Sequence, residues 1–251
     1  MTTKGSDLQD LKERIRRLER GGAAAMAGTL SLGIPNLDGA LPDGGLPLGA
    51  VHSIAADPSQ ADHGGAALGF VAYLAGAIAR RQQRPVLWIT PQRNLYAPAL
   101  ARLGLTPKDL FVLCGADDDR ALWAAEQALR CAALATAVVE VKSLSPVAAR
   151  RLQLAAEAAG VTGLVIQQDA DAAPLGTLSH WRIAGAPSPG DKTDLARQVC
   201  WSVALCRVRG GRPAAARVMC RMEGAVPALA CAADQFVERS ESVARRASFQ
   251  R

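Results

Sequence analysis

The sequence predicts an α/β fold in which helices flank a largely parallel sheet and antiparallel strands extend that sheet toward the C-terminus. Between residues 50 and 167, short and continuous apolar runs alternate with helical segments. Strands that are apolar throughout are typical of a parallel sheet covered on both faces. After residue 168, β-rich segments follow one another without intervening helices, which predicts the antiparallel extension.

The predicted fold is built around the segment Leu46–Arg81. This segment contains an apolar strand at Ala50–Ala55, a loop rich in Gly, Pro and Asp, and an apolar helix from about Gly65. A strand, a small-residue loop and a helix form the frame of a phosphate-binding loop, whose amides and helix N-terminus hold the phosphates. The loop DPSQADHGG lacks the Gly-Lys-Ser/Thr ending, and no lysine lies between Lys12 and Lys108. The frame is present without the groups that carry its chemistry.

The remaining strands and helices of the parallel half follow in order. Strands are expected at 85–89, 110–114, 137–141 and 163–167, and helices at 95–103, 120–135 and 146–159. Three aspartates, Asp117–Asp119, precede the second of these helices. Carboxylates at this place cap exposed N–H groups and interact favourably with the helix dipole, so we expect capping rather than metal binding.

The C-terminal part is rich in β-forming residues and in arginine. Strands are expected at 179–183, 198–208 and 215–222, with a loop at 184–194 and a hairpin turn at 209–213. Arg207 and Arg209 share a strand face by two-residue alternation, and so do Arg217 and Arg221. A basic face of this kind suits a phosphate backbone or an acidic protein. We favour a protein partner, with any DNA contact indirect, because no aromatic residues interleave with the arginines for base stacking.

The two ends of the chain have a different character from the centre. Residues 6–20 predict a short amphipathic helix, which is marginal by itself and must dock on its own domain or on another chain. Its narrow apolar stripe consists of Leu8, Leu11, Ile15 and Leu18. The polar C-terminal end carries Arg245 and Arg246. Three regions result: a helix and linker at 1–27, an α/β domain at 28–230, and a basic tail at 231–251.

Composition excludes several classes of protein. The net charge of +6 permits an acidic partner or nucleic acid, although the basic residues are spread along the chain. The six cysteines form no C-x-x-C pair and have no His at ligand spacing, and most lie in apolar runs, which indicates buried free thiols in a reducing compartment. No apolar run approaches the roughly 20 residues of a membrane span, and no signal peptide is visible. We expect a cytoplasmic protein with no metal site and no membrane contact.

Several motifs together resemble a known family. The stretch SLGIPNLDGALPDGGLPLGAVHSI is similar to the entry of a RecA-like core, where a Leu-Asp pair precedes a GGLPxG turn and the phosphate-loop strand. Downstream, LYAPALARLGL, DLFVLCGADDDRALWAAEQAL and AVVEVKSLSP keep the RecA order of segments. With its basic N-terminal helix and Arg-rich C-terminal strands, the chain looks most like the ImuA family, RecA/SulA-like proteins of the bacterial damage-induced mutagenesis cassette. The resemblance covers residues 28–168.

The resemblance implies a function and a set of partners. It implies a RecA-like core and a non-catalytic accessory role in the SOS response, in DNA repair by translesion synthesis and in induced mutagenesis. Genes of this family accompany ImuB, a catalytically dead homologue of Y-family polymerases, and an error-prone polymerase. The resemblance therefore implies protein–protein contact with an ImuB-like protein, and with RecA and the error-prone polymerase.

The phosphate-loop residues of the recombinases are changed in this chain. Their Lys and Ser/Thr fall between Asp62 and Ala67, where this sequence has DHGGAA. His63, Gly64 and Gly65 are thus vestiges of a phosphate loop. A neutral imidazole at His63 donates one hydrogen bond but does not replace an ammonium group. Amides at Gly64 and Gly65 are still able to accept an anion.

The other catalytic positions of the recombinases have also changed. The carboxylate that activates water falls near Gln92 or Arg93, and neither side chain deprotonates water. The metal-side carboxylate falls near Glu140, and the nucleotide-sensing glutamine falls on Gln167 or Gln168. The resemblance therefore implies a degenerate P-loop fold, a pseudo-ATPase that binds no cofactor.

Two alternatives remain open at this point. A divergent ATPase of the recombinase type would bind ATP stoichiometrically and turn it over. A SulA-like inhibitor of the cell-division GTPase would cause filamentation when overexpressed. The gene neighbourhood or a filamentation assay separates these functions from that of a mutagenesis accessory protein.

Overall fold

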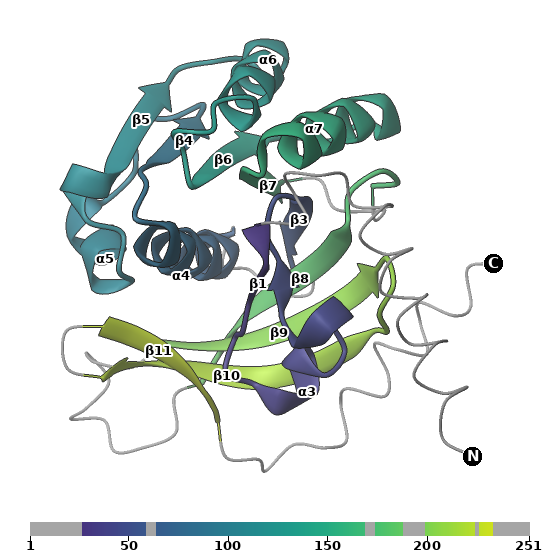
Figure 1. Cartoon of the computed structure of the whole chain (residues 1–251). Helices are drawn as coiled ribbons and strands as arrows, with labels where there is room; N and C mark the ends of the chain where they lie inside the picture. Colours follow the sequence, from purple (N-terminus) through teal and green to yellow (C-terminus); the bar gives the residue numbers. More distant parts are fainter. Residues whose placement is uncertain (1–26, 59–63, 169–173, 188–198, 224–225, 233–251) are drawn as a thin grey trace, which may run out of the picture.

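A nine-stranded mixed sheet forms the centre of the protein (Figure 1). The computed structural model describes residues 27–58, 64–168, 174–187, 199–223 and 226–232. The strand order in the sheet is β11-β10-β9-β8-β3-β7-β6-β4-β5, and β1 pairs with β2 in a separate antiparallel ribbon. The N-terminal strands are β1 (Thr29–Leu30), β2 (Leu46–Pro47), β3 (Val51–Ala56), β4 (Val86–Thr90) and β5 (Leu110–Cys114). The later strands are β6 (Thr136–Val141), β7 (Thr162–Gln167), β8 (Ser179–Ala186), β9 (Val199–Val208), β10 (Ala214–Glu223) and β11 (Val226–Cys231).

Helices cover both faces of the parallel half of the sheet (Figure 1). Helices α4 (Gly65–Gln82) and α5 (Ala97–Arg102) lie on one side, and α6 (Asp118–Leu129) and α7 (Pro146–Ala159) lie on the other. Short helical turns occur at α3 (Pro35–Asp38), η1 (Pro42–Gly44) and η2 (Pro107–Asp109). Because both faces are covered, the parallel strands in the middle of the sheet are buried, as their continuous apolar sequences predict. The edge strand β5 differs, because Phe111, Val112 and Leu113 are exposed. No helix within these described ranges is both long and apolar enough to cross a membrane.

The helix ends follow their sequence signals. Ser145 caps α7, because its hydroxyl accepts a hydrogen bond from the Ala148 N–H at 3.2 Å, and Gly160 closes the helix in the left-handed conformation. Asp117 caps α6 by accepting from the Arg120 N–H at 2.9 Å, which confirms the predicted capping role. The predicted end of α6 at residue 135 is wrong. The Ala135 N–H already donates to the carbonyl of Pro85 at 2.8 Å, so this part of the chain belongs to the sheet.

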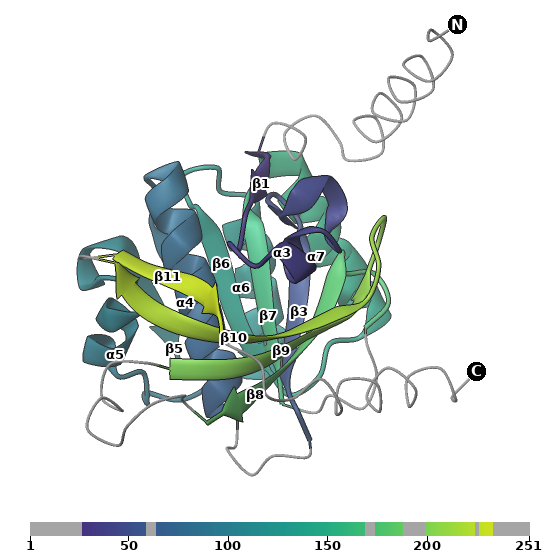
Figure 2. The same cartoon turned by 90° about the horizontal axis from the view of Figure 1, so that it is seen from below.

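The antiparallel extension begins later than the sequence predicts. Strand β8 runs parallel to β3, with Ser53 opposite His180, and only β9, β10 and β11 are antiparallel to their neighbours. The chain reaches this parallel position because residues 174–178 pass along α7, where Gly176 lies against Pro146 and Ala149. Figure 2 shows β9, β10 and β11 as one curved layer, with α3 against β10.

The core contains three tryptophans and lies mainly between the sheet and α4. Phe70 of α4 packs against Trp181 of β8 and Trp201 of β9, with ring centroids 6.3 and 5.7 Å apart. Trp88 of β4 is also fully buried. A second apolar cluster lies beneath α6 and α7. All six cysteines lie within the described residues and are free thiols, as predicted. The prediction that they are buried is wrong for Cys131 and Cys231, which are exposed, and only Cys200 and Cys220 are fully buried.

A close approach of backbones at Gly76 gives a first prediction. A Cβ atom added at Gly76 would lie 2.7 Å from the carbonyl carbon and oxygen of Gly104 and 3.0 Å from the Leu105 nitrogen. Alanine in a helix interior normally gains about 0.5–1 kcal/mol over glycine. We expect Gly76→Ala to lower the free energy of unfolding by about 1–3 kcal/mol instead, because the backbone of Gly104 and Leu105, just after α5, must move away from α4.

The matched control for this prediction is Gly65→Ala at the start of the same helix. A Cβ there has no atom within 4 Å. Urea unfolding of both variants checks the prediction. A Gly76→Ala protein as stable as Gly65→Ala would show that α4 is not in close contact with the backbone of Gly104 and Leu105.

Candidate functional site

The carboxyl ends of the parallel strands are where α/β proteins place their ligands. Strands β3, β4, β6 and β7 all end at this edge, since Val141 lies opposite Gln167 and Ala55 also lies opposite Gln167. The residues carried over from the recombinase pattern lie at or just beyond these strand ends. Each of them can therefore be compared with the role that the pattern implies.

The start of α4 is the part of the expected phosphate loop that the structure describes. Gly64 has a φ of 89° and precedes the first helical residue, Gly65. Ala66 and Ala67 follow and are buried. Neither residue carries the ammonium or hydroxyl group that the recombinase pattern places between Asp62 and Ala67. His63 lies outside the described residues.

Glu140 forms part of the core at this edge. Its residue surface is only 8% exposed, and its Oε1 accepts a hydrogen bond from Trp88 Nε1–H at 2.6 Å. Burial raises the pKa of the Glu140 carboxyl, and hydrogen bonds from Trp88 and Thr90 partly oppose this shift. A carboxyl that is buried and accepts from an indole N–H serves to satisfy that N–H in the core.

The positions after β4 and β7 form local hydrogen bonds. The Gln92 Oε1 accepts from the Asn94 side chain at 3.1 Å, and the Gln92 N–H donates to the Thr90 hydroxyl at 3.3 Å. Arg93 is exposed. The Gln167 Oε1 accepts from the Leu144 N–H at 3.2 Å, which fixes the connection between β6 and α7. These groups stabilise loops at the edge, whereas Gln168 next to them is exposed.

The four strand arginines are only partly brought together. Arg207 lies opposite His180, and Arg217 lies opposite Ser202. Arg207 lies five residues after Ser202, so regular alternation would place the two on opposite faces of the sheet. A β-bulge in β9 at Cys206 reverses this and places Arg207 on the same face as Arg217 and Arg221. The prediction that Arg209 shares a strand face with Arg207 is wrong, because β9 ends at Val208 and Arg209 lies in the turn that follows.

Three of these four arginines already have partners in the fold. The Arg207 guanidinium donates to the carbonyl of Pro174 at 2.6 Å, and burial lowers its pKa. Arg209 forms an ion pair with Glu157 of α7 at 3.3 Å. Arg217 donates to the carbonyl of Pro187. Arg221 is exposed. The basic sheet face therefore holds connections in place, and Arg221 projects from it.

A buried polar network that the sequence did not predict joins β3 to β8. His52 Nε2–H donates to the Pro47 carbonyl at 2.8 Å, so its Nδ1 accepts from the Ser179 hydroxyl at 2.6 Å. The Ser179 oxygen in turn accepts from Trp181 Nε1–H at 2.7 Å. Burial lowers the pKa of His52 to about 4.

The second histidine of the network has a similar environment. His180 Nδ1 lies 2.9 Å from the Ser53 hydroxyl, and the residue is 1% exposed. Burial and the nearby charges of Arg182 and Arg207 lower the pKa of His180 to about 4. Sequence spacing could not reveal the network, because only the parallel pairing of β3 with β8 brings these residues together.

The remaining predicted partner-binding residues lie outside the described residues. These are the apolar stripe and the C-terminal arginines, namely Leu8, Leu11, Ile15, Leu18, Arg245 and Arg246. Their proposed role therefore stays a prediction.

The fold is that of an α/β protein with a large, mostly parallel sheet that is flanked by helices and extended by antiparallel strands. No family model matches the chain. Protein ImuA from two strains of Caulobacter vibrioides, NA1000 / CB15N and ATCC 19089 / CIP 103742 / CB 15, is 36% identical to it over 196 residues, covering 73% of this chain and 80% of the relative. The chain belongs to the ImuA family.

A solved structure also aligns with the chain. The crystal structure of SulA from Pseudomonas aeruginosa aligns with a TM-score of 0.40 and 24% sequence identity. The alignment covers 47% of this chain and 96% of the SulA chain.

Proposed function

We propose that the protein is a non-catalytic accessory factor of SOS-induced mutagenesis, built on a RecA-like core with a degenerate phosphate loop. It acts in the cytoplasm by binding an ImuB-like protein, and RecA, together with an error-prone polymerase during translesion synthesis. Membership of the ImuA family supports the pathway. DNA is reached through these partners.

The observation that carries the non-catalytic part is the environment of Glu140. Phosphoryl transfer depends on positioned charges that hold the phosphates, the metal ion and the attacking water. Glu140, where the resemblance places the metal-side carboxylate, is instead buried and accepts from Trp88 Nε1–H at 2.6 Å, and its raised pKa disfavours the ionised form that a metal ion needs. Ala66 and Ala67 supply no ammonium or hydroxyl group. The edge of the sheet thus favours a structural role.

This proposal predicts the absence of ATP chemistry. Calorimetric titration of the full chain with ATP and Mg²⁺ is expected to give no stoichiometric binding heat, and phosphate release is expected to stay at the level of a buffer blank. Stoichiometric binding that Glu140→Gln abolishes would instead establish a divergent ATPase.

Partner binding is tested by capture of an ImuB-like protein. We expect the full chain to capture the ImuB-like protein. We expect chains that lack residues 1–20 or 233–251 to lose this binding. The second truncation starts at 233 because β11 runs to Cys231 and the Ala232 N–H donates to the Arg217 carbonyl at 3.0 Å. Full binding by both truncated chains would place the contact on the α/β domain.

A further inference from the structure

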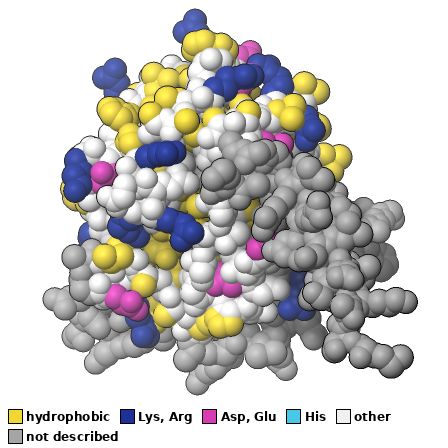
Figure 3. Space-filling model, viewed as in Figure 1, with side chains coloured by type: hydrophobic (Ala, Val, Ile, Leu, Met, Phe, Trp, Pro, Cys, Tyr) yellow, Lys and Arg dark blue, Asp and Glu magenta, His cyan; other side chains and the backbone are white. Residues whose placement is uncertain are grey.

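The outer side of α6 and α7 exposes three large apolar side chains. Trp123 of α6 is 62% exposed, and Val147 and Leu154 of α7 are 73% and 49% exposed. Val147 and Leu154 are seven residues apart and therefore lie on one side of their helix. Figure 3 shows hydrophobic and basic side chains next to each other at the top of the molecule, where Figure 1 places α6 and α7. We call this the α6–α7 surface, defined by Trp123, Arg130, Val147, Arg150, Arg151 and Leu154.

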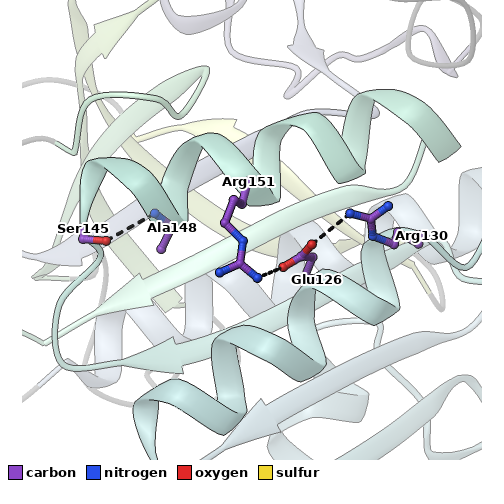
Figure 4. Close-up of polar contacts among 5 residues, drawn as sticks. All are labelled: Glu126, Arg130, Ser145, Ala148 and Arg151. Atoms are coloured by element: carbon purple, nitrogen blue, oxygen red, sulfur yellow. Dashed lines mark hydrogen bonds and ion pairs between the residues drawn. The ribbon is translucent and has the colours of Figure 1, made fainter.

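An ion-pair network joins the two helices beneath this surface (Figure 4). Glu126 of α6 accepts from Arg130 on the same helix at 2.9 Å and from Arg151 of α7. Trp123 lies about one helical turn before Glu126, and Val147 lies about one turn before Arg151. The apolar side chains therefore border the line along which the helices meet, and the network fixes the distance between them.

The charge on this surface is mainly positive. The side chains of Arg130 and Arg151 are 58% and 60% exposed, and Arg150 beside them is exposed. Hydrogen bonds from Arg130 and Arg151 hold the pKa of the Glu126 carboxyl below its usual range. The carboxylate is therefore ionised and pairs with these two arginines. Asp117 and Asp119 are exposed at the N-terminal end of α6, where Asp117 forms an ion pair with the exposed Arg120. The surface is thus basic along its centre and acidic at one end.

We propose that the α6–α7 surface is a docking site for an acidic amphipathic helix of a partner protein. Its apolar side chains contact Trp123, Val147 and Leu154, and its carboxylates face Arg130, Arg150 and Arg151. Tryptophan and arginine are among the residues that most often carry the binding energy of protein interfaces. An amphipathic helix binds to an apolar surface through the apolar side chains at its positions i, i+3, i+4 and i+7. The inference rests on the proposed adaptor function and names the surface and the chemistry of the partner.

Charge complementarity selects a partner rather than a segment of this chain. Residues 1–26 carry six basic and four acidic residues, and residues 233–251 carry four basic and three acidic ones. Both segments are net positive, as is the centre of the surface. An acidic helix from another protein is attracted to the same surface, and this attraction also raises its association rate.

The chain contains its own reporter for binding at this surface. Of the four tryptophans, Trp88, Trp181 and Trp201 are at most 1% exposed, whereas Trp123 is 62% exposed. The probe is a synthetic peptide without tryptophan, about 18 residues long, with leucines at i, i+3, i+4 and i+7 and glutamates beside them. Binding to the full chain is expected to shift tryptophan emission to the blue and to reduce quenching by acrylamide. A peptide with lysine in place of every glutamate is expected to bind at least tenfold more weakly.

Three variants distinguish binding at the α6–α7 surface from non-specific binding of the peptide. Leu154→Ser and Arg150→Glu are each expected to weaken the acidic peptide at least fivefold. Val226→Ser removes a side chain that is 47% exposed on β11, at the far edge of the sheet, and is expected to leave binding unchanged. Circular dichroism establishes that the variants are folded. Equal binding of the acidic and lysine peptides, no binding of the acidic peptide, or equal loss in Val226→Ser would overturn the proposal.

Capture of the ImuB-like protein distinguishes failure of this inference from failure of the proposed function. If the wild type captures that protein and the double variant Trp123→Ser/Leu154→Ser does not, the adaptor function and the docking surface are both supported. If both proteins capture it equally, the adaptor function stands and the docking surface is wrong. If the wild type captures nothing while the acidic peptide still binds, the surface stands and its partner is a different acidic protein. A dimer that the double variant dissociates would assign the surface to a second copy of the chain and overturn the inference.

Discussion

Acidification from pH 7 to pH 4 is expected to lower the free energy of unfolding by about 6 kcal/mol through two buried histidines. His52 and His180 have pKa values of about 4 in the folded protein, against 6.5 for an ordinary histidine. The unfolded chain binds protons at both sites from about pH 6.5 downward, whereas the folded protein binds them only near pH 4. Between these values the unfolded state holds more protons, so stability falls as the pH falls.

Urea unfolding at a series of pH values measures this loss. His180→Gln removes one of the two titrating groups, so the decrease between pH 7 and pH 4 is expected to shrink to about half. The pKa of Glu140 is raised by burial, so this group acts in the opposite direction and favours the folded state on acidification. An unchanged pH dependence in His180→Gln would show that His180 is not buried in its neutral form.

Replacing Glu140 by alanine is expected to lower the free energy of unfolding by about 3–4 kcal/mol. The substitution leaves the Trp88 indole N–H buried without its acceptor at 2.6 Å and opens a cavity beside the tryptophan. Glu140→Gln keeps an oxygen in the same place and removes the cost of burying an ionisable group. We expect that variant to stay within about 1 kcal/mol of the wild type. Denaturant unfolding at neutral pH measures both variants.

The pair of variants also separates two roles for this residue. A carboxylate that serves a metal ion loses its function in the glutamine variant while the fold is retained. A carboxyl that serves Trp88 loses stability in the alanine variant only. Equal destabilisation by alanine and glutamine would contradict the hydrogen-bond role.

Much of the parallel half could be predicted because its signals are local. Strands β4 to β7 are continuous apolar runs, and Pro146 and Gly160 mark the ends of α7. The short elements β1, β2 and α3 have few residues and little periodicity, so no such signal marks them. The sequence did not predict β11 (Val226–Cys231) either, although its alternating burial follows directly after β10.

Contacts between residues that are far apart in the sequence could not be predicted from the sequence. Glu140 fell near the expected strand end, but its hydrogen bond to Trp88 depends on the pairing of β4 with β6. The bulge at Cys206 changes which arginines share a face, and no residue type announces a bulge. Trp123 was overlooked because a tryptophan in an amphipathic helix normally marks the buried side, whereas here alanines occupy that side.

The central position of β3 has a consequence for how the chain is made. Val51 pairs with Gly163 on one side, and His52 pairs with Ser179 on the other. During synthesis β3 leaves the ribosome long before either neighbour exists, and non-local pairings of this kind form slowly. Strands β9 to β11, by contrast, are neighbours both in sequence and in space. The N-terminal half of a growing chain therefore carries an apolar strand without a sheet partner, and the sheet becomes continuous only once β7 and β8 have emerged.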